Sequence, residues 1–346
     1  MKLTPAEKSA PLPYPRWLVI TLCCAGLLAV FVPVFLKGMD KARAGADDFL
    51  GLYAGARLAG TPGIYDPSLI RQVQLETAGV TGDALLSTRL PCFPLMLRPL
   101  AQLPYATAHA IWYLLRFIAV IGFLFLWPYS SRWLAALVCC WSLPLAAGLA
   151  NGQDAPLLLL WIALSQILEQ AKRPFWAGLA LSMCAAKYHL FLLVPFVLLY
   201  HRRWRVLAGG LAGGIVLASL CCVAGGWDWP AQYLKAISVA SINPGPQIMP
   251  NLHGLLSPAP LWIVILLSVV VAGISVVFIA RLDFPSGFAI ALFGSLLISY
   301  HAYTADAVTL VPAVLMVLAY SRAAALRYAG VLISTPLPWL LILRRR

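Results

Sequence analysis

Long apolar runs separated by short polar breaks make up most of the chain. A helix that spans a membrane needs about 20 mainly apolar residues, and many of the runs have this length or somewhat less. Apolar segments are expected at residues 17–36, 104–127, 133–150, 155–168, 174–186, 188–200, 206–224, 259–280, 285–300, 305–320 and 326–343. The pattern predicts an all-α integral membrane protein, a polytopic bundle with about 10–11 transmembrane helices.

The longest polar stretch, residues 37–103, separates the first two apolar segments. Its later part, RLPCFPLMLRPLAQLPY, is apolar but broken by prolines, so it is expected to lie against the membrane rather than cross it. The first apolar run lacks a clear cleavage site, which predicts a retained helix rather than a signal peptide. With no internal repeat, residues 1–346 are interpreted as one membrane-embedded domain.

Composition supports this class and excludes others. Hydrophobic residues make up 62% of the chain and charged residues 11%, whereas a soluble domain carries about a quarter charged residues. The formal charge of +13 is dispersed between apolar runs without a basic stripe, so no nucleic-acid partner is expected. The 8 cysteines include adjacent pairs inside apolar runs and show no zinc-ligand spacing, so no metal site is expected.

The basic residues indicate the orientation of the segments. With the N-terminus in the cytoplasm and alternating crossings, most basic residues of short loops fall on the cytoplasmic side, as the positive-inside rule requires. They are Lys2, Lys8, Arg16, Arg132, Lys172, Arg173, Arg202, Arg203, Arg205, Arg281, Arg322 and Arg327. Short outer loops hold only Lys187 and Lys235. The predicted location is the inner (plasma) membrane, multi-pass, with the 37–103 loop facing the periplasm or extracytoplasm.

Two segments test this topology. Residues 174–200 are interpreted as two short helices hinged at Lys187, because one long helix would bury that lysine at a steep cost and move HRRWR (201–205) to the outer side. The C-terminal arginines 344–346 end outside after the last crossing, unless the prolines at 336 and 338 turn that segment back or another segment is miscounted.

Every unusual polar cluster lies on the predicted outer side. The clusters are Asp47-Asp48, NGQD at 151–154, KYH at 187–189, MPNLHG at 249–254 and SYHAYTAD at 299–306. Polar groups at such depth are costly unless they line a cavity or bind something. The five breaks therefore predict one site at the outer membrane–water boundary.

The residue types in these clusters favour one chemistry. A carboxylate pair provides a general base, and lysine and histidines can hold a phosphate or neutralise a phosphate leaving group. Aromatic side chains suit sugar faces or lipid headgroups; the candidates are Trp227, Trp229, Tyr300 and Tyr303. Together they predict sugar transfer from a polyprenyl phosphate, with no cofactor and no required metal because cationic side chains are present.

Ordered stretches of the chain resemble a known family. DDFLGLYAGARLAGTPGIYD (47–66) contains Asp-Phe, a tyrosine five residues on from the aspartate, and then Gly and Tyr-Asp. The stretches that follow in the same order are the proline-rich 91–104, NGQDAPLLLL, AGLALSMCAAKYHLFLLVPFVLL with basic residues after it, and SYHAYTAD. This set resembles glycosyltransferase family 87, the polyprenyl-phosphate-mannose-type mannosyltransferases of the GT-C superfamily.

The resemblance implies a GT-C-type bundle with a long first extracytoplasmic loop, and it implies roles for three residues. The catalytic aspartate of the first loop corresponds to Asp48, and the late histidine and aspartate correspond to His301 and Asp306. The chain departs from the late motif, with Tyr300 in place of proline and Ala305 before the aspartate. It is also short for the family.

The remaining polar residues are candidate substrate contacts with structural alternatives. The candidates are Asp47, Lys187, His189, Gln153, Asp154, Asn251, His253 and Asp306. Aspartate and asparagine at helix starts can simply cap a helix, and a lysine can snorkel. Arg57 and Arg89 can meet phosphate. Arg116 lies in the middle of its segment and must pair with something, more often in a structural than in a catalytic role. His109 and His201 are treated as background.

The leading interpretation is an inverting glycosyltransferase that moves a hexose, mannose by resemblance, from a polyprenyl-phosphate donor to a lipid or glycan acceptor outside the cytoplasm. Asp48 is its general base, and His301, with Lys187 or a first-loop arginine, stabilises the leaving phosphate. A transporter or lipid-linked-sugar flippase is the first alternative, although transporters favour inverted repeats and midplane charges. An inactive family member is the second, because the late motif departs from the pattern.

Overall fold

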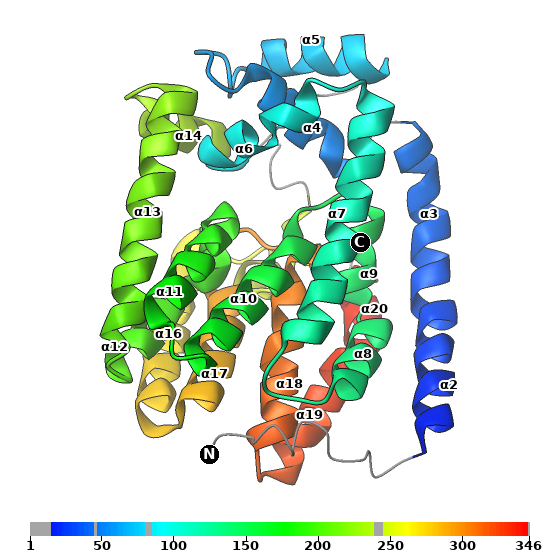
Figure 1. Ribbon diagram of the computed structural model, residues 1–346, viewed down its shortest axis with the longest axis vertical. Helices are drawn as coiled ribbons and strands as arrows, with labels where there is room; N and C mark the ends of the chain where they lie inside the picture. The colour runs from blue at the N-terminus through cyan, green and yellow to red at the C-terminus, as the bar shows by residue number, and fades with distance from the viewer. Residues whose placement is uncertain (1–14, 45–46, 80–84, 87, 239–244, 345–346) are drawn as a thin grey trace.

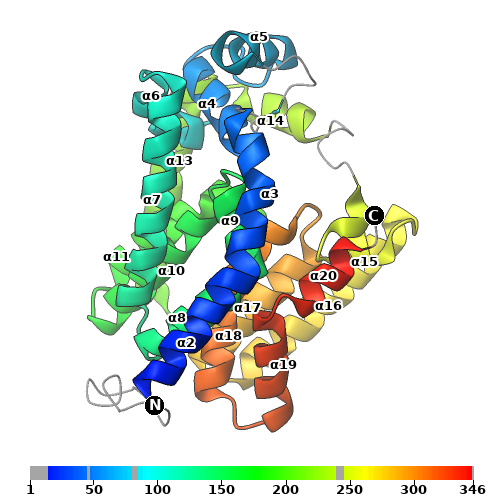
Figure 2. The ribbon, with the colours of Figure 1, turned by 90° about the vertical axis from the view of Figure 1, so that its right-hand side faces the viewer.

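The structure, a computed structural model, describes residues 15–44, 47–79, 85–86, 88–238 and 245–344. Helices follow one another from α2 (Arg16–Gly26) to α20 (Leu337–Leu343), and none of these described ranges contains a strand. Figure 1 shows a bundle with a cap of short helices at one end, and Figure 2 shows the same cap from the side. The predicted all-α class is confirmed.

The first span is one continuous rod. It is built from α2, the π-helical turn η1 (Leu27–Phe31) and α3 (Val32–Arg43), and 26 of its residues, Arg16–Lys41, are apolar enough to cross a membrane. Pro33 explains the π-helical turn, because proline lacks the amide hydrogen and its ring clashes with the carbonyl one turn earlier. Lys2 and Lys8, which entered the orientation argument, lie outside the described residues.

The described part of the 37–103 loop folds into the cap. Its helices are α4 (Asp48–Leu58), α5 (Pro67–Ala78) and α6 (Cys92–Ala101). Helix α6 has 10 residues, too few to cross a membrane, and its first amide lies 3.3 Å from the sulfur of Cys221 in α13 (Trp204–Gly225). A helix of this length fits the prediction that this proline-broken stretch does not cross the membrane.

The number of spans by length and composition is lower than predicted. Among the described residues, four helices qualify alone, and up to seven spans result if each bent pair counts as one. Besides the first rod, the four are α7 (Tyr105–Leu126), α13 and α16 (Leu261–Arg281). Shorter apolar helices include α10 (Ala155–Gln170), α17 (Phe284–Ile298) and the pair η5 (Thr304–Thr309) and α18 (Leu310–Tyr320). Every predicted apolar segment lies on a helix, so the difference comes from short and bent segments.

Each of the three bends among the described helices lies next to a proline, and the bend within residues 174–200 lies next to Pro195. Helices α8 (Arg132–Trp141) and α9 (Leu143–Ala150) meet at 69°, next to Pro144. Helices α19 (Ala324–Ser334) and α20 meet at 58° near Pro336 and Pro338, the prolines at which the sequence allowed the last segment to turn back. The last segment is therefore not a straight span. The residues after Arg344, which entered the topology argument, lie outside the described residues.

Residues 174–200 form two segments that return to the face from which they start. Helix α11 (Pro174–Ser182) and the 3₁₀ segment η2 (Met183–Phe191) make an angle of 115° with α12 (Val194–Tyr200), and Lys187 leaves helical geometry at φ −132°, ψ 56°. Arg203 then pairs with Glu169 at 3.0 Å, beside the loop before α11. The predicted break is confirmed, with the turn completed a few residues later.

The bundle has an apolar interior and an apolar exterior. Helices α10, α17 and α18 contribute the largest groups of side chains to one buried cluster, which includes Leu159, Phe288 and Leu315. Helix α16 exposes most of its leucine, isoleucine and valine side chains outward. Such an exposed surface is unfavourable in water but fits contact with lipid. The fold is therefore that of a membrane-embedded bundle with a polar cap.

Candidate functional site

The five predicted polar breaks contact one another in the structure. The amide of Asp48 donates to the carbonyl of Asn151 at 3.0 Å, and Lys187 contacts Asp154 and Asp306. The side chains of Asn251 and His253 join the 249–254 stretch to backbone carbonyls of the 299–306 stretch. The site therefore lies where the start of α4, the α9–α10 turn, η2 and η5 meet.

Asp47 is buried and its carboxylate is fully engaged. One oxygen caps α4 by accepting from the amide of Phe49 at 3.2 Å, and the other contacts His109 Nε2 at 2.8 Å and accepts from the Tyr113 hydroxyl at 3.2 Å. Tyr105 adds a further side-chain hydrogen bond. This arrangement joins α4 to α7, so the capping alternative describes Asp47 better than a free catalytic group.

His109 and its neighbours correct the sequence interpretation, which treated this histidine as background. Tyr105, His109 and Tyr113 are spaced four residues apart, and Arg116 follows three residues later. On a helix this spacing places polar groups along one face, so the pattern within the apolar 104–127 segment was the available signal. The face lies against Asp47 and the α9–α10 turn.

Asp48, in contrast, keeps an exposed side chain. Its carboxylate hydrogen-bonds to the side chain of Gln153 and lies within electrostatic range of Lys187 and Arg89. Protein atoms around the carboxylate keep part of it away from water, and this desolvation raises the pKa of Asp48. The hydrogen bond from Gln153 and the charges of Lys187 and Arg89 oppose the rise. A solvent-accessible carboxylate with a raised pKa is a stronger base than a free aspartate.

Beside Asp48 lies a buried network of alternating charges. Arg89 makes a two-pronged pair with Asp154, at 2.6 Å and 2.8 Å, and Lys187 contacts Asp154 at 3.3 Å and pairs closely with Asp306. Burial alone would raise the pKa of Asp154, but Arg89 and Lys187 hold it well below its usual range. Two cations and two carboxylates balance within this network, and Asp48 lies beside it.

Lys187 has no donor left for a ligand in this arrangement. Its ammonium group contacts Gln153 Oε1 at 3.3 Å, Asp154 at 3.3 Å and Asp306. A lysine ammonium has three N–H donors, so these three acceptors use all of them. The kink at Lys187 points the side chain into the network.

His189 and His301 lie next to this network, with ring centroids 6.1 Å apart. Burial lowers the pKa of His301, outweighing the opposing charge of Asp306, so its imidazole is neutral near pH 7. His189 Nε2 is buried and has no hydrogen-bond partner among the described residues. These rings can donate or accept one hydrogen bond but do not add positive charge at neutral pH.

Asn251 and His253 connect the last two breaks. Asn251 caps α15 (Leu252–Leu256) and donates to the carbonyl of Ser299 at 2.8 Å. His253 stacks on Tyr300 with ring centroids 4.5 Å apart and contacts its carbonyl at 3.1 Å. Asn251 therefore has a structural role here, whereas the exposed Tyr300 ring is accessible beside the site.

Other candidates lie further from Asp48 or lack ligand geometry. Arg57, at the far end of α4, is exposed and contacts the carbonyl of Ala101 at 3.4 Å. Trp227 is almost fully exposed at the edge of the cap. Within the part of the chain that the structure describes, no group of three or more histidine, cysteine, aspartate or glutamate side chains is placed to hold a metal ion.

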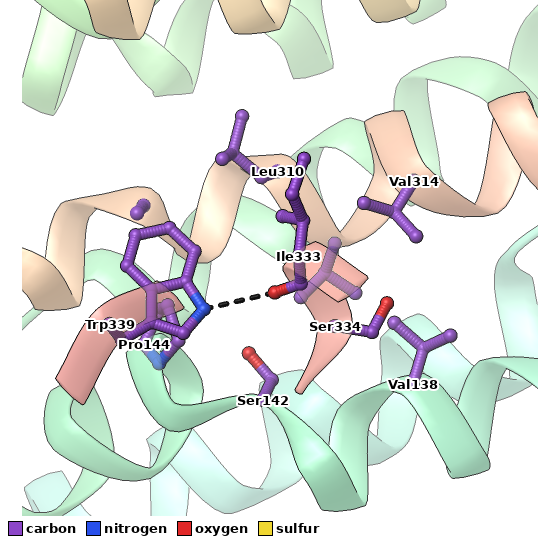
Figure 3. A pocket seen from close by; sticks show the side chains of 10 residues that line it. Val138, Ser142, Pro144, Leu310, Val314, Ile333, Ser334 and Trp339 are labelled. Atoms are coloured by element: carbon purple, nitrogen blue, oxygen red, sulfur yellow. Dashed lines mark hydrogen bonds between the residues drawn. The ribbon is translucent and has the colours of Figure 1, made fainter. Parts of the chain in front are cut away.

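A small crevice lies apart from the charged network, between α8–α9, α18 and the α19–α20 bend. It is lined mainly by apolar side chains, including Val138, Leu310 and Trp339, and its volume is about 10 Å³, room for roughly one water (Figure 3). Trp339 closes one side by donating to the carbonyl of Ile333 at 2.9 Å. It is too small and too apolar to be the site of the chemistry.

Comparison with known proteins found a family model that matches the chain, and its range covers part of the site. The family model described as glycosyltransferase family 87 matches residues 91–300. The matched range contains Gln153, Asp154 and Lys187, whereas Asp48 precedes it and His301 follows it directly. No match was found among curated proteins, and none among solved structures.

Proposed function

Because the chain belongs to glycosyltransferase family 87 and is therefore a glycosyltransferase, we propose that it moves a hexose, mannose in the first instance, from a polyprenyl phosphate to an extracytoplasmic acceptor. The family membership favours this function over the transporter and flippase alternatives. The observation that carries the catalytic assignment is Asp48, an exposed carboxylate beside a charge-balanced network. We further propose a GT-C-type arrangement of the bundle.

Asp48 acts as the general base in this proposal. Its carboxylate accepts the proton of the acceptor hydroxyl while the hydroxyl oxygen bonds to the anomeric carbon. The bond from that carbon to the phosphate oxygen breaks, and its electron pair leaves with the polyprenyl phosphate. Attack from the side opposite the leaving group inverts the anomeric configuration. The raised pKa of Asp48 supports this role, because a base works best when its pKa approaches the working pH.

His301 provides hydrogen bonding to the departing phosphate. It is a neutral donor next to the network, and Arg89 and Lys187 contribute positive potential from behind it. Lys187 acts mainly by positioning, because its donors contact Gln153, Asp154 and Asp306. His189, Tyr300 and His253 are placed to contact the sugar or the lipid headgroup. The predicted independence from metal stays a prediction.

The two ends of α13 support the proposed orientation. Its 22 residues correspond to about 33 Å, with the basic 201–205 stretch at its start and Gly225 packed against Pro91 and Trp229 of the cap region at its end. By the positive-inside rule the basic end faces the cytoplasm. The proposal therefore places the cap and Asp48 on the outer side of the inner (plasma) membrane.

Transfer by the purified protein tests the proposal. Radiolabelled polyprenyl-phosphate-mannose is supplied with host lipid extract, in parallel with polyprenyl-phosphate-glucose and with a nucleotide-activated mannose. We expect labelled product only with a polyprenyl-phosphate donor and not with the nucleotide-activated mannose. The anomeric configuration of the new linkage should be opposite to that of the donor. Transfer from the nucleotide sugar, or retention of the donor's configuration, would contradict the proposed donor class or the inverting mechanism.

A further inference from the structure

The turn at residues 151–154 makes two contacts that meet at Gln153. On one side the Gln153 side chain hydrogen-bonds to the carboxylate of Asp48. On the other side Lys187 Nζ donates to Gln153 Oε1 at 3.3 Å. The Gln153 amide thus bridges the proposed base and the buried charge network.

Lys187 fixes which way this amide points. A lysine ammonium group has donors only, so the oxygen of the Gln153 amide must face Lys187. The NH₂ group is then left to face Asp48, where it donates to the carboxylate. Asn and Gln orientations are assigned from such networks, and here the network permits one orientation.

Helix α7 holds the turn from behind. Arg116, which is fully buried, donates from Nη1 to the carbonyls of Gly148 and Leu149 at 3.0 Å and reaches the carbonyl of Gln153 at 3.4 Å. Trp112 Nε1 donates to the carbonyl of Gly152 at 2.8 Å. The backbone at Gln153 is therefore fixed independently of any bound substrate.

We propose that Gln153 is a positioning residue for the base: its NH₂ group holds the Asp48 carboxylate in the ionised form and aimed at the acceptor hydroxyl, rather than contacting the sugar. This inference rests on the proposed function. Three charged groups face Asp48 from the surrounding elements: Lys187 of η2 and Arg89 of the cap favour the ionised form, and Asp47 opposes it. Gln153 supplies the hydrogen bond among them.

Two substitutions at Gln153 separate this role from substrate binding. Gln153→Glu has nearly the same shape and keeps an acceptor for Lys187, but it loses the donor to Asp48 and adds a like charge. Gln153→Met removes both contacts. Each change raises the pKa of Asp48, because the ionised form loses a donor, so the base is ionised only at higher pH. The acidic limb of the pH profile of kcat therefore moves to higher pH. On that limb, kcat of the variants should be about tenfold lower than that of the wild type at the same pH.

The experiment measures kcat and the donor KM of the purified protein from pH 4 to 9, with radiolabelled polyprenyl-phosphate-mannose and host lipid extract. Gln102→Glu, which adds the same charge at an exposed position at the end of α6, is the matched control and should retain the wild-type profile. We expect both Gln153 variants to shift the acidic limb upward, Gln153→Glu further, with an unchanged donor KM.

Two results would overturn the inference. Profiles that superimpose on the wild-type profile would show that Gln153 does not act on the base, and a raised donor KM with an unshifted limb would make it a substrate contact. If Gln153→Met does not fold, the near-isosteric Gln153→Glu alone decides. Full activity of Asp48→Asn would instead contradict the proposed function, so the two failures are distinguishable.

Discussion

Replacing Lys187 with methionine is expected to destabilise the protein strongly. The side chain is 2% exposed, and its ammonium group lies between Asp154 and Asp306, which are each 2% exposed. The substitution keeps the length of the side chain but leaves buried carboxylates without their shared cation. Removing one partner of a buried ion pair costs about 3–5 kcal/mol.

The two carboxylates are not equally dependent on Lys187. Asp154 retains its two-pronged pair with Arg89, at 2.6 Å and 2.8 Å. Asp306 loses its cation and keeps only neutral donors such as the amide of Tyr303, at 2.8 Å. The double variant Lys187→Met/Asp306→Asn should therefore recover most of the lost stability, whereas Lys187→Met/Asp154→Asn should not, because it leaves Arg89 unpaired as well.

Thermal unfolding of the detergent-solubilised protein measures these differences. For a chain of this size each kcal/mol shifts Tm by about 2 °C, so Lys187→Met should lower Tm by about 6–10 °C. Lys235→Met, at an exposed position in α14 (Trp229–Ile237), is the control and should leave Tm unchanged. An unchanged Tm in Lys187→Met, or a double variant with Asp306→Asn as unstable as the single one, would refute the proposed charge network.

Two further predictions concern glycines with matched controls. Gly152 has φ +74°, and Gly152→Ala places a methyl group 2.7 Å from a carboxylate oxygen of Asp47, so the variant should lose about 2–4 kcal/mol of stability and transfer less sugar. Its control is Gly79→Ala, which has a similar φ of +66° but no atom within 4 Å of the new methyl group, and which should lose only about 1–2 kcal/mol. Equal losses in Tm would contradict the crowding at Gly152. Gly209→Ala places its methyl group 1.9 Å from a carbonyl oxygen of α11 and should lower Tm by several degrees, while Gly214→Ala, with open space around it, should be neutral or stabilising. Similar Tm values for the two alanine variants would exclude close α11–α13 packing.

The positions of the helices along the chain could be predicted from hydrophobic segments, because lipid requires every backbone group to be paired within a helix. The break at Lys187 was predictable for the same reason, since a lysine at the centre of a straight span would be isolated in an apolar layer. Bends were harder to predict, because a proline shows where a helix can bend but not by how much. The number of straight spans therefore came out lower than the sequence predicted.

The site was predicted as a set of polar breaks but not as a network. The sequence placed Asp47 and Asp48 side by side with no means of deciding which one is engaged, because that depends on His109 and Tyr113 from a distant segment. Lys187 was predicted as a phosphate contact, whereas its donors are directed to side chains from two other segments. Such pairings join residues between 34 and 119 positions apart, and local spacing does not encode them.

The most direct test of the central claim compares mannose transfer by the wild-type protein, Asp48→Asn and Glu76→Ala, using radiolabelled polyprenyl-phosphate-mannose and host lipid extract. Asp48→Asn keeps the size of the side chain but removes the base, and Glu76→Ala removes an exposed carboxylate of α5 that contacts only Gln72 among the described residues. We predict that transfer is lost in Asp48→Asn, with an unchanged or higher Tm, and retained in Glu76→Ala. Wild-type transfer rates in a folded Asp48→Asn protein would contradict the assignment of Asp48 as the general base.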